Sequence, residues 1–462
     1  MTRIDDLIRE QEARFLDRTP RSQSMWREAC ALMPGGVTSS WASTRPIPVW
    51  IDRGAGSHVW DVDGNEYVDY HAGYGVNVVG HGNPHVVEAV RNRVTMGTHF
   101  AQPTPDSIAV ARMLAGRFGL PQWRFTNSGT EATMDAVHLA RAITGRDLLV
   151  KIEGSYHGHH DALNVSLWRS LERLGPVESP HQQSGAGIPQ VMGDLVRIVP
   201  FNDVAAVDRV FAAEGDRIAA MILEPMMMNA GIIPPQPGYL EAMRRITRRH
   251  GALLIFDEVK TGLVVAPGGA TELFGVTPDL VCLAKALAGG IPCGAIGGTD
   301  AVMAAIGDGR YDQVGTFNGN PLTMAAARAV LGNVLTPEAY VAAEAFGRRM
   351  FADASSALAA HGQPCYGMVH GFKGSVVFHD RPATNYREFL EIDTAVSHLH
   401  YLVQYNNGVF TAPWAKTESW TLSVMHTHAD AERFVVNVDR VGAMLADVTD
   451  RHSDLFAAGS VT

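Results

Sequence analysis

The chain has 462 residues, 46% of them hydrophobic and 19% charged, which is the composition of a globular protein with room for two or three domains. Its formal net charge of −10 and the lack of a dense lysine or arginine block argue against nucleic acid or a membrane surface as a main partner. A charged N-terminus without an apolar core, no apolar run near the roughly 18 residues of a membrane span, and four cysteines without CxxC spacing predict free thiols in the cytoplasm.

The first 70 residues predict a helix, a loop and a small set of strands. Polar and apolar positions mix at helical spacing over 1–32, and a loop rich in glycine, proline and serine follows over 33–48. Short strands are expected over 49–70. Within them the pair Asp63 and Gly64 lies between alternating runs, which indicates a β-hairpin.

Short apolar runs alternate with helical stretches from about residue 80 to residue 330, and one such helix is expected over 238–250. This alternation predicts βαβ units and a largely parallel sheet, with ligands bound at the carboxyl ends of the strands. The runs are WRFT (123–126), LLVKI (148–152), LVRIV (195–199), AAMILE (219–224), ALLIFDE (252–258) and LVCLA (280–284).

The C-terminal region has an α+β pattern. Helices are expected over 337–360, 384–403 and 427–446, beside strands at SVVFH (375–379) and WTLSVMH (420–426). The turn-rich segment 171–190 has the length that is typical of a lid or a disordered loop.

The motif TNSGTEAT follows the run WRFT and opens a helix. Ser128, Gly129 and Thr130 would lie at the helix N-terminus, where unpaired N–H groups and the helix dipole favour a phosphate. Gly129 would let the backbone approach a ligand closely. The alternative is an ordinary capping box, with Ser or Thr followed by Glu.

The run LLIFDEV ends abruptly in Asp257 and Glu258. A carboxylate at the carboxyl end of a buried strand needs a partner, and a protonated ring nitrogen, a metal or an arginine would each serve. A structural salt bridge or a helix cap is the alternative.

Lys285 follows the apolar run LVCLA and precedes a glycine-rich turn. A buried lysine has a lowered pKa, which makes its amine a nucleophile for carbonyl groups. The alternative is a lysine that emerges into solvent at the end of a strand.

Three histidines in GSYHGHHD (154–161) suggest a metal, but they lack the helical spacing of the usual zinc motifs, so no metal is expected. Tyr156 placed above a flat ligand ring fits this loop better. A phosphate cradle, a ring platform, a carboxylate for a ring nitrogen and a reactive lysine together predict pyridoxal 5′-phosphate (PLP), whose ring acts as an electron sink.

The chain resembles the class III aminotransferases, and the branch nearest to it is that of glutamate-1-semialdehyde 2,1-aminomutase. The resemblance covers about Met33 to His426 and implies a PLP-dependent fold type I enzyme, like aspartate aminotransferase, that acts as a homodimer. It also implies a small domain built from 1–75 and 331–462 around a large PLP-binding domain of 76–330. The motifs are MPGGV, WDVDGNEYVDY, GHGNP, TNSGTEATMDAVHLAR, GSYHGHHD, ILEPMMMNAG, GALLIFDEVKTG, GGIPCGAIGG and GTFNGNPLTMAAA.

The resemblance implies roles for particular residues. Lys285 matches the lysine that forms the internal aldimine, Asp257 the partner of the pyridine nitrogen, and Tyr156 the aromatic residue that stacks on the ring. The other implied cofactor-binding positions are Ser128, Gly129, Thr130, His157, Glu224, Asn229, Val259 and, from the neighbouring subunit, Gly315 and Thr316. Glu418 matches an acidic residue of the aminomutase site.

The chain departs from the aminomutase pattern at positions that contact substrate. Ala42 and Val264 stand where the aminomutase has arginines, and 171–190 replaces its gating loop. Losing a bidentate guanidinium weakens recognition of a carboxylate. Arg45 is either a displaced clamp or a surface residue, and Trp41 is a further candidate for the substrate pocket.

These features predict an aminotransferase that moves an amino group between an amine or amino acid and a keto or aldehyde acceptor through pyridoxamine phosphate. Glutamate-1-semialdehyde 2,1-aminomutase, which transfers the group within one molecule, is the alternative. Racemase and decarboxylase reactions also occur on this scaffold, and a binding protein without catalysis is a rival of another class.

Overall fold

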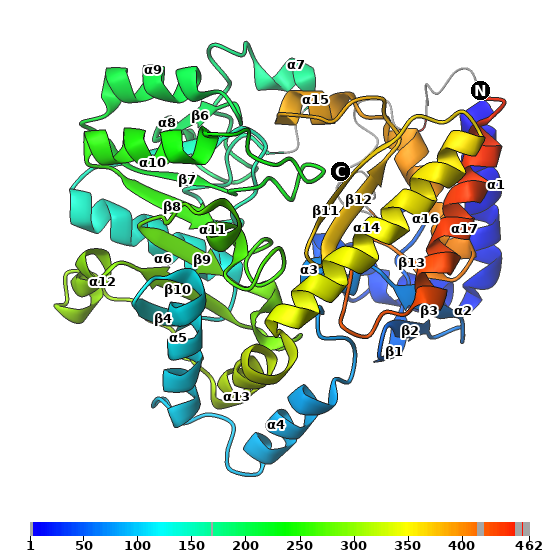
Figure 1. Ribbon diagram of the computed structural model, residues 1–462, viewed down its shortest axis with the longest axis horizontal. Helices are drawn as coiled ribbons and strands as arrows, with labels where there is room; N and C mark the ends of the chain where they lie inside the picture. Colours follow the sequence, from blue (N-terminus) through cyan, green and yellow to red (C-terminus); the bar gives the residue numbers. More distant parts are fainter. Residues whose placement is uncertain (1–2, 168–169, 414–419, 449–454, 456–462) are drawn as a thin grey trace.

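The computed structural model describes residues 3–167, 170–413, 420–448 and 455. One half of the molecule holds a seven-stranded sheet covered by helices, and the other half holds two smaller sheets with the first and last helices (Figure 1). The expected α/β class, with a large and mostly parallel sheet beside a smaller α+β unit, is therefore confirmed. The domain boundaries 1–75, 76–330 and 331–462 stay predictions.

The N-terminal segment forms two helices instead of the single helix expected over 1–32. Helix α1 spans Arg3–Arg18 and α2 spans Pro20–Cys30. The break falls at Pro20, because proline has no N–H to continue the first helix and is favoured in the first turn of the next.

The predicted hairpin is present between β2 (His58–Asp61) and β3 (Glu66–Asp69), which pair antiparallel. The Asp61 carboxylate accepts a hydrogen bond from the Asn65 N–H at 2.8 Å, and Gly64 has a φ of +89°. The hairpin therefore closes through the turn residues that the sequence indicates.

Strands from both ends of the chain share the sheet that contains this hairpin. Strand β1 (Ile51–Ala55) pairs with β2, and β13 (Val409–Phe410) pairs parallel with β3. The C-terminal region is thus hydrogen bonded to the N-terminal one.

The large sheet has the strand order β4-β10-β9-β8-β7-β5-β6. All of its strands run parallel except β10, which is antiparallel to both of its neighbours. The strands are β4 (Gln122–Thr126), β5 (Leu148–Ile152), β6 (Val196–Val199), β7 (Ile218–Leu223), β8 (Leu253–Asp257), β9 (Leu280–Leu283) and β10 (Gly294–Gly298).

Strand β10, with the sequence GAIGG, is the one strand of this sheet that the apolar runs do not indicate. Its glycines are required by close packing against β4. A Cβ at Gly297 would lie 2.5 Å from the ring of Trp123, and a Cβ at Gly294 would lie 2.3 Å from the hydroxyl of Thr126.

Successive residues of each strand enter two different cores, one on each face of the sheet. Leu149, Ile222 and Ile255 pack with helix α6 (Gly129–Thr144) on one face, while Val150 belongs to the large core on the other. Both faces are covered, as expected for strands that read as continuous apolar runs.

The remaining helices between α2 and α14 connect or cover these strands. They are η1 (Pro34–Gly36), η2 (Ser40–Ala42), α3 (Ala72–Gly75), α4 (Pro84–Val94), α5 (Pro105–Phe118), α7 (Leu171–Leu174), α8 (Gln190–Asp194), α9 (Val204–Glu214), α10 (Tyr239–His250), α11 (Gly269–Phe274), η3 (Lys285–Ala288), α12 (Asp300–Gly307), α13 (Pro321–Ala329) and η4 (Val330–Val334).

The C-terminal region differs from the sequence prediction at two places. The helix expected over 384–403 is divided into α15 and α16, because the Asp393 side chain caps α16 by accepting from the Ala395 N–H at 2.8 Å. The strand expected over 420–426 keeps only two residues, because the Ser423 N–H turns back to Nδ1 of His426 at 2.8 Å. The elements are α14 (Pro337–Ala360), β11 (Tyr366–His370), β12 (Lys373–Val377), α15 (Tyr386–Glu391), α16 (Thr394–Asn406), β14 (Trp420–Thr421) and α17 (His428–Leu445).

No helix in the described part of the chain combines the length and apolar character that a membrane span requires.

Glu258, the second acid of the LLIFDEV motif, is a structural residue. It is fully buried, and its carboxylate accepts hydrogen bonds from the Ala270 N–H (2.6 Å), the Thr271 N–H (2.8 Å) and the Thr261 hydroxyl (2.9 Å). The salt-bridge-or-cap alternative weighed from the sequence thus describes Glu258, which anchors the start of α11.

We expect Glu258→Gln to lower the free energy of unfolding by about 1–3 kcal/mol, because one amide N–H₂ would face backbone N–H donors and leave them unsatisfied. Thermal melting followed by circular dichroism measures the loss. The exposed Glu432→Gln in α17 is the matched control. Equal melting temperatures of Glu258→Gln and the wild type would contradict this account.

Candidate active site

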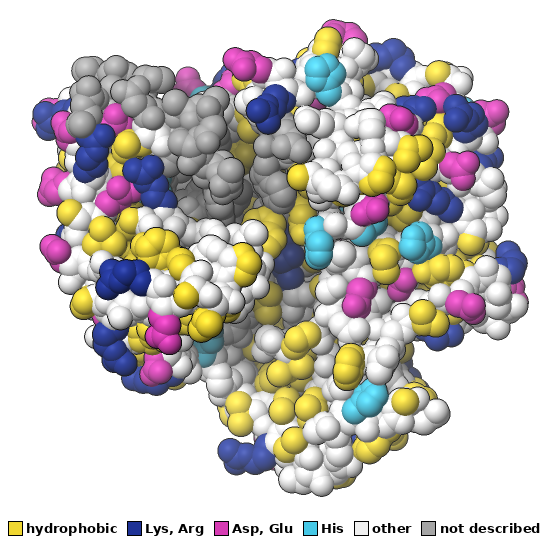
Figure 2. Space-filling view, turned by 180° about the vertical axis from the view of Figure 1, so that it is seen from behind, with side chains coloured by type: hydrophobic (Ala, Val, Ile, Leu, Met, Phe, Trp, Pro, Cys, Tyr) yellow, Lys and Arg dark blue, Asp and Glu magenta, His cyan; other side chains and the backbone are white. Residues whose placement is uncertain are grey.

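A cavity of about 390 Å³ opens at the carboxyl ends of the central strands. Its wall is formed by the loops that follow β4, β5, β7, β8 and β9, together with residues near η2 and α3. Seen from behind, the molecule is hollowed between its two halves, and a basic side chain is visible in the hollow (Figure 2). This is the edge of the sheet at which the sequence places the ligand.

The turn between β4 and α6 presents the N-terminus of a 16-residue helix to the cavity. Ser128 caps the helix by accepting from the Glu131 N–H at 3.2 Å, and the Glu131 carboxylate accepts from the Asn127 N–H at 2.6 Å. An N-cap by Ser128 is therefore present, while the Glu131 carboxylate bonds the N–H that precedes the cap residue and so does not complete a capping box; the same turn lines the cavity. Capping by Ser128 and phosphate binding do not exclude each other.

Close packing behind this turn leaves no room for a side chain at its glycine. A Cβ at Gly129 would lie 2.9 Å from both methyl groups of Val259. A Cβ at Gly158, in the loop after β5, would lie 2.8 Å from the Thr130 hydroxyl. The N–H groups of the helix start can therefore approach an anionic group directly.

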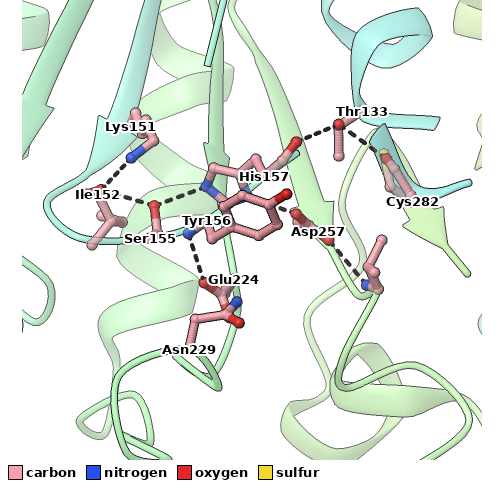
Figure 3. A network of polar contacts seen from close by, with 12 residues as sticks. Thr133, Lys151, Ile152, Ser155, Tyr156, His157, Glu224, Asn229, Asp257 and Cys282 are labelled. Atoms are coloured by element: carbon pink, nitrogen blue, oxygen red, sulfur yellow. Dashed lines mark hydrogen bonds and ion pairs between the residues drawn. The ribbon is translucent and has the colours of Figure 1, made fainter. Parts of the chain in front are cut away.

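Asp257 ends β8 almost completely buried, with 4% of its surface exposed. Its Oδ2 lies 2.7 Å from Nδ1 of His157, and its Oδ1 accepts from the Val259 N–H at 3.0 Å. Nε2 of His157 lies 2.8 Å from the Ser155 hydroxyl, so this histidine is held at both ring nitrogens (Figure 3). Asp257 thus has a fixed orientation at the cavity wall.

Glu224 organises the opposite part of the wall. Its carboxylate accepts from the Tyr156 N–H at 3.1 Å, the Met228 N–H at 2.9 Å and the Asn229 side-chain amide at 3.0 Å (Figure 3). Glu224 is 3% exposed, so these bonds form away from bulk solvent. It fixes both the loop after β5 and the turn after β7.

Tyr156 and Trp41 form an aromatic corner of the cavity with Tyr74. The ring of Trp41 meets that of Tyr156 edge-on at 5.5 Å, and the Tyr74 hydroxyl donates to the Trp41 carbonyl at 2.6 Å. Burial raises the pKa of Tyr156, although a hydrogen bond with Trp41 opposes that effect, so its hydroxyl stays protonated at neutral pH.

Lys285 begins η3 directly after β9, and it lines the same cavity as Asp257. Its φ is +44°, which is the left-handed region that residues with a side chain rarely adopt. Such strain persists only where the surrounding structure enforces it, and it is concentrated at functional sites. Lys285 is half-buried and does not project freely from the strand end into solvent.

Most residues singled out from the sequence line one cavity. Those that do are Trp41, Ser128, Gly129, Thr130, Tyr156, His157, Glu224, Asn229, Asp257, Val259 and Lys285. Their roles at a cofactor or substrate stay predictions.

Three of the singled-out residues, Arg45, Gly315 and Thr316, lie elsewhere. The guanidinium of Arg45 pairs with the Glu12 carboxylate at 2.5 Å, so the structure places it in an ion pair between the 33–48 loop and α1 and not on the cavity wall. Gly315 and Thr316 are exposed. Their loop is held near the helix start because Asn318 accepts from the Asn127 side-chain amide at 3.0 Å. Glu418 lies outside the described residues.

Sequence reasoning missed Tyr74 and Lys260, which also line the cavity. Tyr74 has a φ of +61° between glycines, and the run AGYG was the signal that could have marked a strained turn. Lys260 directly follows Val259 and donates to the Met228 carbonyl at 3.2 Å. These residues are 32 positions apart, so no local sequence pattern indicates the contact.

The histidines after Tyr156 do not form a metal centre in the described residues, where no group of His, Cys, Asp and Glu is arranged to hold an ion. Burial, with smaller effects from neighbouring histidines, lowers the pKa of His160 to about 4.

The donor set fits a phosphate ester on a flat aromatic ring. The start of α6 offers N–H groups and hydroxyls to a phosphate, Val259 and Tyr156 offer apolar faces, and the buried Asp257 offers a carboxylate to a protonated ring nitrogen. Lys285 supplies an amine in the same cavity.

Residues 40–370 match the family described as Aminotransferase class-III. Glutamate-1-semialdehyde 2,1-aminomutase of Syntrophobacter fumaroxidans is 39% identical over 417 residues, which are 89% of this chain and 95% of that protein. An omega-transaminase from Sphaerobacter thermophilus superposes with a TM-score of 0.87 at 33% identity, covering 91% of this chain and 97% of its own. The K286A glutamate-1-semialdehyde-aminomutase of Pseudomonas aeruginosa in complex with PMP has a TM-score of 0.86 at 29% identity, covering 96% and 98%.

We expect Gly129→Ala to weaken the binding of PLP by about tenfold or more, because its Cβ would displace Val259 from the wall of the cavity. Titration of the purified apoprotein by tryptophan fluorescence measures the dissociation constant. Gly116→Ala is the matched control, since a Cβ at Gly116 in α5 has nothing within 4 Å. A Gly129→Ala protein that binds PLP as tightly as Gly116→Ala would refute the close-packing argument.

Proposed function

The chain belongs to the class III aminotransferases, which are PLP-dependent enzymes, and on that premise we propose that it transfers an amino group between an amine or amino acid donor and a keto or aldehyde acceptor. The observation that carries this proposal is the cavity that holds Lys285, Asp257 and the start of α6 beneath an aromatic corner. This cavity holds the groups that such a transfer needs. No arginine is among the described residues that line it.

Different residues of the chain would hold the phosphate and the ring of the cofactor. N–H groups of Ser128, Gly129 and Thr130 would bind the phosphate at the positive end of α6. Asp257, oriented by His157, would keep a ring nitrogen protonated. When bound, PLP supplies the electron sink that stabilises negative charge at the substrate carbon.

Lys285 moves the proton. Lys285 lines the cavity together with Asp257, so its amine could take a proton from the substrate carbon and return it at a neighbouring atom. The strained backbone at Lys285 fixes the direction in which the side chain leaves the main chain at the cavity wall, and proton transfer requires that the amine come within hydrogen-bond distance of the substrate carbon.

The lining of the cavity favours intermolecular transfer over the aminomutase reaction. Ala42 is an exposed residue of η2 and Val264 is fully buried in the core, so neither position presents a cation to the cavity. Arg45 is paired with Glu12. Among the described lining residues Lys260 and Lys285 are the cations, and neither offers the planar two-point grip of a guanidinium.

Trp41 and Tyr74 support a donor with a bulky apolar group. Their rings lie 5.6 Å apart at the mouth of the cavity, and Trp41 also contacts Tyr156. An aryl-substituted amine or a β-amino acid would place its ring against this surface. A β-phenylalanine aminotransferase from Variovorax paradoxus is among the similar structures, with a TM-score of 0.84.

The aminomutase reaction is the second candidate. It is supported by the 38–40% identity to proteins named glutamate-1-semialdehyde 2,1-aminomutase, which extends over 89–92% of this chain. Both reactions use the same cofactor residues, so they differ in substrate contacts at the cavity mouth.

A second copy of this chain is the expected partner. Exposed apolar side chains gather on the 96–100 segment and the 314–317 loop: Met96 is 60%, Phe100 48%, Val314 80% and Phe317 58% exposed. These two segments touch, since the rings of His99 and Phe317 lie 5.2 Å apart. A monomer rarely leaves such a patch uncovered, and a second copy seated on it would cover the loop that carries Gly315 and Thr316.

We expect the PLP-loaded protein to form alanine from pyruvate and an aryl-substituted amine or β-amino acid, and to form no 5-aminolevulinate from glutamate-1-semialdehyde alone. Chromatography of both products measures the two reactions side by side. Lys285→Ala should abolish turnover, because the proton carrier is lost. Accumulation of 5-aminolevulinate without any added acceptor would establish the aminomutase reaction instead.

We expect Val314→Asp combined with Phe317→Asp to dissociate the dimer and weaken PLP binding, because buried charges would oppose association. Light scattering after size-exclusion chromatography measures the mass. Val341→Asp on α14, where the side chain is 72% exposed, is the matched control. A wild-type protein that is monomeric at micromolar concentration would sink the proposal of a shared site.

A further inference from the structure

Helix α15 connects the C-terminal region to the large sheet. In Figure 1 it lies apart from α14 and α17, toward the half of the molecule that holds the seven-stranded sheet. The Thr384 carbonyl, just before α15, accepts from the Asn202 side-chain amide at 2.8 Å, and Asn202 in turn accepts from the Gln236 N–H at 2.8 Å. The start of α15 is therefore bound to the segments that follow β6 and β7.

Two consecutive residues of α15 contact two consecutive residues of the loop after β5. Nε and Nη2 of Arg387 donate to the two carboxylate oxygens of Glu153 at 2.9 and 2.8 Å, which is a bidentate pair. The ring of Tyr386 packs on Gly154 so closely that a Cβ at Gly154 would lie 2.2 Å from it. Gly154 also has a φ of +73°, which favours glycine. The loop and α15 therefore cannot shift independently of each other.

The same loop reaches the cavity three residues after Glu153. Glu153 is 1% exposed and is not part of the cavity wall, whereas Tyr156 is. Between them the Ser155 hydroxyl donates to the Ile152 carbonyl at 2.8 Å, which folds the backbone back toward the end of β5. A displacement of Glu153 or Gly154 therefore displaces Tyr156 as well, because only one or two residues separate them.

We propose that Arg387 is a positioning residue for the reaction: through Glu153 it fixes the loop after β5, and with it the place of the Tyr156 ring at the cavity wall. Glu224 holds the loop from the cavity side through the Tyr156 N–H, and Arg387 holds it from behind. Without the guanidinium, the buried Glu153 carboxylate lacks its bidentate partner, and movement of the loop toward water relieves that cost. The inference rests on the proposed role of Tyr156 against the PLP ring.

Arg197 provides a matched control for Arg387. Its guanidinium donates to both oxygens of Glu214, so this pair is bidentate as well, and the side chains of Arg197 and Arg387 are each 19% exposed. The Arg197 pair joins β6 to α9, and neither of its members is among the residues that line the cavity. Arg197→Met therefore removes a similar ion pair without releasing the loop after β5.

Hydrogen exchange tests the proposal without any reaction. In apoprotein carrying Arg387→Met, we expect the protection of the Tyr156 amide to fall about tenfold, because a released loop opens its bond to Glu224 more often. In the PLP-loaded variant, the circular dichroism band of the bound cofactor should weaken, and kcat with the best donor should fall about tenfold because the ring contact is misplaced. Arg387→Lys, which keeps the charge without the bidentate geometry, should recover part of each loss.

Arg197→Met should leave amide protection, the cofactor band and kcat unchanged. If Arg387→Met does not fold, Glu153→Gln combined with Arg387→Met takes its place, since it breaks the same link and leaves no buried charge unpaired. Wild-type protection of the Tyr156 amide, or an unchanged cofactor band, in the folded variant would overturn the proposal, because Arg387 would then serve stability alone. Both changes in a protein whose wild type has no transaminase activity would count against the proposed function only.

Discussion

The structure depends on hydrogen-bond partners for the acidic side chains at the carboxyl ends of one buried sheet. Asp257 is held by His157, Glu258 by the start of α11, Glu153 by Arg387, and Glu224 by three N–H donors. A buried charge without such partners costs several kcal/mol, so each loop that supplies a partner is fixed in place by the acid that it serves. The cavity keeps its shape because the loops around it are bound to the strand ends and not only to one another.

The sequence predicts most of the large sheet, and it predicts which loops meet. Apolar runs mark the central strands β5, β7, β8 and β9 because a strand covered on both faces has no polar side, whereas β4 and β6 at the edges each carry a polar residue. The carboxyl ends of parallel strands lie at one edge of a sheet. Motifs at those ends, such as the turn at Gly129 and the acid at Asp257, therefore fall around one cavity. Strand β10 could not be predicted in this way, because its glycines give it no apolar pattern. Contact with Trp123 requires a glycine at position 297.

Partners that are distant in the chain could not be predicted in the same way. The pairing of Arg45 with Glu12 and of Arg387 with Glu153 joins residues that are 33 and 234 positions apart, and a lysine or arginine on a helix carries no local sign of its partner. The apolar run of β5 includes the buried Lys151 and is followed by the buried Glu153, which indicates that charges enter the core there but not which residue pairs with them.

Our proposal assigns cofactor chemistry and substrate choice to different parts of the molecule. The acids at the strand ends are fixed by the sheet and by the groups that hydrogen-bond to them. The mouth includes residues of η2 and α3, where the Tyr74 hydroxyl donates to the Trp41 carbonyl and Tyr74 lies in a strained turn. Loops of this kind can change without disturbing the buried charges. Ala42 is exposed and Val264 lies in the core, so neither presents a cation to the mouth, while Asp257 and Lys285 share one cavity. Family membership consequently fixes the PLP-dependent class of the enzyme, and our proposal for its donor rests on the aromatic residues at the mouth.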